Sequence, residues 1–80
     1  MTEKEAAQKV IDKILGIVKP PRVIAVFVGK DRNSIQMTRP DSDVYQKAIF
    51  MRLNDFCGVY NADVTEDMII DDLRYAGFQP

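Results

Sequence analysis

Apolar residues between Thr2 and Lys19 recur at spacings of three and four, which predicts an amphipathic helix with one apolar side. Thr2 and Glu5 have the spacing of a capping box, in which each side chain accepts a backbone N–H at the start of the helix. Pro20 and Pro21 follow this segment. Because proline lacks a backbone N–H and restricts the residue before it, we expect the helix to end near Lys19.

A β-hairpin is predicted over the next part of the chain, Arg22–Thr38. Arg22–Gly29 is short, rich in β-branched residues and apolar at both odd and even positions, so it is expected to be a strand covered on both faces. Gly29–Asn33 supplies turn residues. Ser34–Thr38 then alternates polar and apolar residues, as a strand with one buried face does.

Two further helices are predicted in the second half of the chain. The first runs from about Val44 towards Cys57 and has more apolar residues than one buried stripe uses. The second begins at Thr65, a good N-cap, and ends before Gly77, which is placed for the left-handed residue of a Schellman motif. Its inner side is predicted to carry Met68, Ile69, Leu73 and Ala76. Residues 59–63 are interpreted as a loop, with a short third strand as the alternative.

The order helix, hairpin, helix, helix (αββαα) predicts a small α+β fold, with helices packed on an antiparallel sheet of two strands, or three if residues 59–63 pair. We expect one domain over residues 1–80, because a chain of 80 residues leaves no room for a second core. The single cysteine, Cys57, excludes an internal disulfide and favours a reducing compartment. The longest apolar run, Val23–Val28, is too short to span a bilayer, so a cytoplasmic protein is expected.

Charge is distributed unevenly along the chain. Residues 1–40 hold eight basic and four acidic side chains, whereas residues 41–80 hold three basic and eight acidic ones. This asymmetry predicts either a molecule with two oppositely charged faces or two halves that neutralise each other within the fold.

Few residues point to catalysis or to a bound cofactor. Histidine is absent, which removes the commonest general base and the commonest transition-metal ligand. The four glycines are isolated, so no phosphate-binding loop or dinucleotide fingerprint is present. Cys57 falls on the inner side of its predicted helix and is interpreted as a small buried apolar residue. We therefore expect no catalytic residue, no metal site and no cofactor.

Three surfaces are candidates for binding a partner. An acidic face is predicted on the last helix, at Glu66, Asp67, Asp71 and Asp72. An apolar interface is predicted where the doubly apolar strand and the second helix have surplus apolar residues, at Val23, Ala25, Phe27, Phe50 and Met51. The alternative to this interface is that the protein's own core buries all of these side chains. A nucleic-acid contact is the third candidate, at Lys30, Arg32 and Arg39.

These surfaces favour a non-enzymatic protein-interaction module that forms a homodimer and presents its acidic face to a partner protein with a basic surface. By analogy of composition, such chains are typical of phage or mobile-element accessory proteins that bind and inhibit a host factor. The alternative is a small dimeric nucleic-acid-binding regulatory protein that uses the basic hairpin. The isoelectric point of 5.2 weighs against that alternative.

Overall fold

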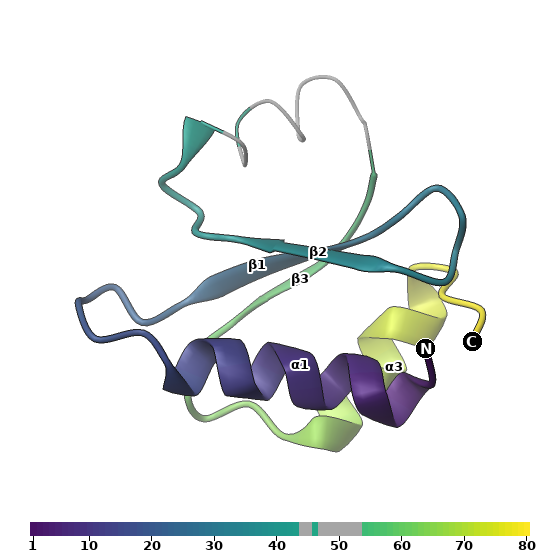
Figure 1. The fold of residues 1–80 in the computed structure, drawn as a ribbon, viewed down its shortest axis with the longest axis horizontal. Coiled ribbons are helices and arrows are strands. Elements are labelled where there is room, and N and C mark those ends of the chain that lie inside the picture. The colour runs from purple at the N-terminus through teal and green to yellow at the C-terminus, as the bar shows by residue number, and fades with distance from the viewer. Residues whose placement is uncertain (44–45, 47–53) are drawn as a thin grey trace.

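The structure is a computed structural model of residues 1–80, and it describes residues 1–43, 46 and 54–80. In these ranges the chain forms two helices and three strands, in the order α1 (Glu3–Leu15), β1 (Ile24–Val28), β2 (Ile35–Thr38), β3 (Asp55–Tyr60) and α3 (Glu66–Tyr75). Both helices lie against one face of the sheet, with α3 beside α1 (Figure 1). The predicted small α+β class is therefore confirmed.

The sheet is antiparallel, with the strand order β2-β1-β3. The pairing of β1 with β2 confirms the predicted hairpin, with Val26 opposite Met37. On the other side of β1, Val26 lies opposite Gly58 and Phe27 lies opposite Phe56, so Cys57 is the extra residue of a bulge in β3. β1 is the central strand, and β2 and β3 are the edges.

All five residues of β1 are buried, as its apolar pattern predicts. Ile24, Val26 and Val28 join the main core beneath the sheet, together with the apolar sides of α1 and α3. Ala25 and Phe27 form a second, smaller buried cluster. Complete burial of such side chains stabilises the fold by about 1.5–3 kcal/mol for each large residue.

The helix ends follow from local chemistry, with one difference from the prediction. Thr2 and Glu5 form the capping box of α1, with N–H···O distances of 3.1 Å in both directions. The helix ends at Leu15 rather than near Lys19. Gly16 follows directly, and glycine has a poor helix propensity, so the proline four residues later is not what ends the helix.

The predicted ends of α3 are both confirmed. The Thr65 hydroxyl accepts the N–H of Met68, and Gly77 has the left-handed φ of 93°. Phe78 N–H donates to Leu73 O at 2.9 Å and Gly77 N–H donates to Arg74 O at 3.1 Å, which is the Schellman pattern. Phe78 is thereby folded back into the main core.

The region before α3 differs most from the prediction. Residues 55–57, expected to end a helix, and residues 59–60, expected to lie in a loop, all belong to β3. Phe56 and Tyr60 are four residues apart, a spacing that fits a helix. Aromatic and β-branched residues also favour strands, and pairing with β1 places both residues on a strand here. Most of the predicted second helix, from Val44 to Leu53, lies outside the described residues. Asp43 and Gln46 are helical.

Candidate protein-interaction surface

The four residues of the predicted acidic face lie on α3 but do not share one environment. Asp67 and Asp71 are exposed and four residues apart, so they lie on the same side of the helix. Glu66 and Asp72 are half-buried. The sequence therefore located the acidic helix correctly, but only part of the face is freely accessible.

Asp72 is held by a hydrogen-bonded chain that joins α3 to β3. Tyr60 Oη donates to Asp72 Oδ2 at 2.7 Å, and Cys57 Sγ lies 3.3 Å from the same Tyr60 Oη. Burial raises the pKa of Tyr60 far above its ordinary value, and the nearby Cys57 and Asp72 raise it further. Burial also raises the pKa of the Cys57 thiol.

A raised pKa keeps the Cys57 thiol protonated at neutral pH, and the thiolate is the nucleophilic form. Cys57 is half-buried and packs against the main core, which agrees with its interpretation as an apolar residue. Its place in a strand bulge, rather than on a helix, corrects the prediction. The Cys57–Tyr60–Asp72 chain thus joins β3 to α3.

Apolar side chains are exposed on the same two elements. Of six large hydrophobic residues that are exposed in the described ranges, four lie on β3 and α3: Phe56 (51%), Val59 (45%), Met68 (53%) and Tyr75 (97%). Met68 was expected on the inner side of its helix. Ile69 and Leu73 occupy that side, and Met68 is turned from Ile69 by about 100°.

These residues line two open depressions along the boundary between β3 and α3. The first, which we call the Val59–Met68 groove, is lined by Val59, Tyr60, Asn61, Asp63, Val64 and Met68. The second is lined by Arg32, Asp55, Phe56, Tyr75, Ala76, Gly77 and Gln79. Sequence reasoning missed Val59 as an exposed residue because it placed residues 59–63 in a loop and not on a strand.

Carboxylates dominate the charge of this region. Between Asn54 and Leu73 the sequence has six acidic residues and no lysine or arginine. Two arginines near this region are already paired: Arg32, in the turn before β2, with Asp55, and Arg74, in the last turn of α3, with Glu3 at 2.6 Å. The Arg74 guanidinium lowers the pKa of Glu3 through this hydrogen bond. Arg74 also attracts Asp71 electrostatically, so the acidic charge of α3 is partly offset towards the end of the helix, whereas Asp67 lies further from this cation.

The predicted apolar interface is in a different position from the exposed apolar residues. Ala25 and Phe27 are buried and Val23 is half-buried, whereas Phe50 and Met51 lie outside the described residues. Both edges of β1 are paired with neighbouring strands. The strand of residues 23–28 therefore offers neither a free edge nor an open face to a second copy of the chain.

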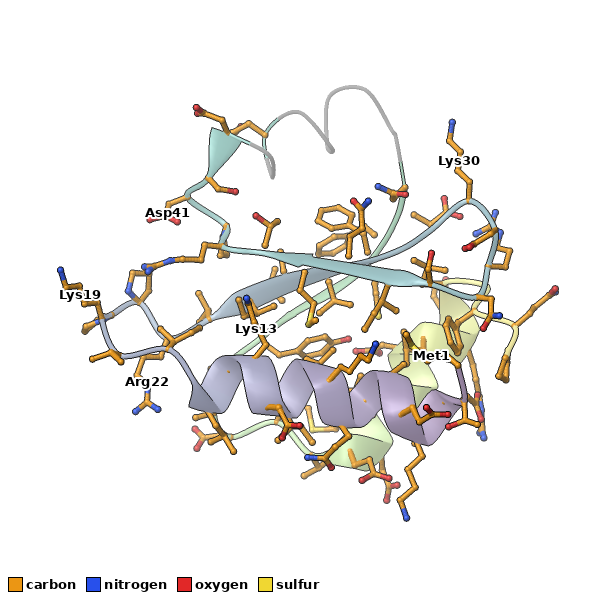
Figure 2. The ribbon with its side chains drawn as sticks, viewed as in Figure 1. Met1, Lys13, Lys19, Arg22, Lys30 and Asp41 are labelled. Carbon is orange, nitrogen blue, oxygen red and sulfur yellow. The ribbon has the colours of Figure 1, made fainter. Side chains whose placement is uncertain are left out.

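The three residues of the predicted nucleic-acid contact are not brought together. Lys30 and Arg32 lie in the turn before β2, and Arg39 directly follows the other end of that strand. Lys30 is exposed, and it stands at the opposite end of the molecule from Lys19 and Arg22 (Figure 2). Arg32 donates to Ala76 O at 3.3 Å in addition to its pairing with Asp55. Arg39 donates to Pro21 O at 3.4 Å, so it lies beside Arg22 at the other end of the molecule from Lys30 and Arg32.

No protein-family model matches the chain, and no curated protein or solved structure is significantly similar to it. Within the described residues, no group of three or more His, Cys, Asp or Glu side chains is arranged to hold a metal ion. A search of the same residues for a helix of the length and apolar character needed to cross a membrane finds none.

Proposed function

We propose that this chain is a non-enzymatic protein-interaction module that binds a basic partner through the exposed side of α3 and the adjoining part of β3. The observation that carries the proposal is the coincidence of exposed apolar side chains with an acidic region. Val59 and Met68 are both about half exposed, and the sequence from Asn54 to Leu73 has six acidic residues and no lysine or arginine, with only Asp55 of the six in an ion pair in the described residues. Apolar residues surrounded by charge of one sign are typical of a surface that binds a partner of the opposite sign.

A protein partner fits this surface better than a nucleic acid. Phosphate backbones require clustered lysine and arginine, but Lys30 and Arg39 are separated by the length of β2, and Arg32 is engaged within the fold. The protonated Cys57 thiol and the absence of histidine in the sequence support a non-enzymatic role. Methionine and aromatic side chains such as Met68 and Tyr75 are enriched in protein interfaces.

A finer form of the proposal is a cytoplasmic accessory protein of a phage or mobile element that inhibits a host protein. In this form α3 occupies a basic host surface that otherwise holds nucleic acid. The finer form rests on analogy of composition. A homodimer would need a surface other than β1, because both edges of β1 are paired.

The proposal is tested by selecting a random displayed peptide library on the immobilised full chain. We expect the selected peptides to be rich in lysine and arginine, because they must complement the carboxylates of α3. A synthesised representative should lose binding to Asp67→Lys/Asp71→Lys. The matched control is Asp12→Lys/Asp41→Lys, which changes the net charge equally at exposed positions outside β3 and α3. The control should retain most of the binding.

Three results would contradict the proposal. One is a library selection with no enrichment of basic peptides, and another is binding that falls equally in both double variants. The third is tight, salt-sensitive binding of duplex DNA that is lost on Lys30→Glu, which would support the nucleic-acid alternative.

A further inference from the structure

The Val59–Met68 groove has the size and lining of a site for one large apolar side chain. The volume of this open groove is about 200 Å³, which is smaller than the range of about 300–1,000 Å³ that is typical of small-molecule sites. Val59, Val64 and Met68 provide apolar contacts from β3, the following loop and α3. A single leucine, methionine or phenylalanine side chain is therefore a better fit than a cofactor.

Hydrogen bonds hold several walls of this groove in place. Tyr60 is fixed by its bond to Asp72. In the loop, Asp63 N–H donates to Asn61 Oδ1 at 2.9 Å, and Val64 N–H donates to Asn61 O at 3.1 Å. A groove with walls that are already ordered loses little conformational entropy on binding, so contacts made there contribute more fully to affinity.

Carboxylates surround the groove on the helix side. Asp63 lines it, and Asp71 and Asp72 follow Met68 by three and four residues, so they are neighbours of Met68 on the helix surface. Asp67 directly precedes Met68. A segment that enters the groove would meet the carboxylate of Asp63 on the loop and that of Asp71 on α3, with Asp67 about 100° further round the helix from Met68.

We propose that the Val59–Met68 groove binds one large apolar side chain of a partner segment, with lysine or arginine residues flanking that side chain and pairing with Asp63, Asp67 and Asp71. This inference rests on the proposed function, since it names the anchor within the acidic surface. The occupant is a short basic segment of a partner protein. The carboxylates set the charge of the partner, and the groove sets which residue of the segment lies at its centre.

The test uses a peptide selected on the full chain and measures its binding by fluorescence anisotropy. Val59→Thr/Met68→Gln keeps side-chain size and strand or helix preference but makes the groove polar. We expect this variant to bind the peptide at least about tenfold more weakly, because the apolar contact is lost. Val18→Thr is the matched control, since Val18 is 90% exposed in the segment between α1 and β1. It should bind within about twofold of the unmodified chain.

A second measurement changes the peptide instead of the protein, so misfolding of a variant cannot explain a loss of binding to the unmodified chain. Replacing the central apolar residue of the peptide by serine should weaken binding to the unmodified chain about tenfold, yet have little effect on binding to Val59→Thr/Met68→Gln. If Asp67→Lys/Asp71→Lys abolishes binding but neither the groove variant nor the serine peptide weakens it, the groove assignment is wrong while the proposed function stands. If no basic peptide binds at all, both are wrong.

Discussion

Gly58→Ala is expected to be strongly destabilising, because the ring of Tyr60 occupies the space above Gly58. A Cβ added at Gly58 would lie 2.5 Å from Tyr60 Oη and 2.7 Å from Tyr60 Cζ. Real Cβ atoms essentially never approach other atoms so closely. Tyr60 cannot move aside freely, since it is 6% exposed and its hydroxyl donates to Asp72.

The expected cost follows from what the ring must give up. Moving Tyr60 breaks a hydrogen bond to a charged acceptor, which is worth about 1.5–3 kcal/mol, and overpacking adds about 1–3 kcal/mol of strain. Alanine recovers about 0.4–1 kcal/mol by restricting the unfolded chain. We therefore expect the free energy of unfolding to fall by about 1.5–5.5 kcal/mol. This is a large part of the roughly 4–12 kcal/mol that is usual for a chain of this length.

Equilibrium unfolding in urea, followed by far-ultraviolet circular dichroism, measures this change. Gly16→Ala is the matched control: its Cβ would have no neighbour closer than 3.5 Å, and Gly16 has a φ of −81° that alanine adopts readily. This control should be neutral or slightly stabilising. If Gly58→Ala unfolds within about 0.5 kcal/mol of the unmodified chain, Tyr60 does not pack over Gly58 and the described contact between β3 and α3 is incorrect.

Three other variants or reactions test the same structure. Tyr60→Phe should lower the free energy of unfolding by about 1–3 kcal/mol, because the hydrogen bond to Asp72 is lost. Tyr75→Phe is the control and should have little effect, since Tyr75 is 97% exposed. Equal effects of the two variants would contradict the hydrogen bond between Tyr60 and Asp72. Glu3→Gln should lower the melting temperature at neutral pH. The difference in melting temperature between the two proteins should shrink as the pH falls below 4.5, the ordinary pKa of glutamate, and vanish below the lowered pKa of Glu3. At that pH Glu3 is protonated in the unmodified chain too, so its pairing with Arg74 is lost there as well. A difference in melting temperature that does not depend on pH would refute this. Cys57 should react with iodoacetamide much more slowly in the folded chain than in urea, since burial raises its pKa, and equal rates would show that the thiol is exposed.

The features that could be predicted from the sequence are those set by neighbouring residues. The capping box of Thr2 and Glu5, the N-cap at Thr65 and the left-handed Gly77 each need only contacts within one turn of helix. The burial of β1 on both faces also follows from its own apolar run.

β3 could not be predicted because its formation depends on a distant part of the chain. Phe56 and Tyr60 have a helical spacing, and only pairing with β1 and the bulge at Cys57 place them on a strand. Without that strand, the hydrogen bond from Tyr60 to Asp72 cannot be predicted either, since it joins side chains on β3 and α3. The exposure of Met68 was missed for a related reason: Ile69 and Leu73 alone define the inner side of α3.

The acidic residues of the candidate surface were predicted from local composition, whereas its apolar residues were not. Asp67 and Asp71 are exposed, in keeping with the prediction. The predicted apolar residues Ala25 and Phe27 are buried instead, because β1 is the centre of the sheet and not an edge. Which apolar side chains remain exposed depends on how the elements pack, and that is a property of the whole fold.

The most direct test of the central claim is a titration of the isotope-labelled chain with a selected basic peptide, followed by amide proton–nitrogen correlation spectra. The proposed surface predicts that the largest chemical-shift changes fall between Val59 and Asp72, on the rim of the Val59–Met68 groove and the exposed side of α3. Changes concentrated instead in the turn around Lys30, or on the lysines of α1, would contradict it.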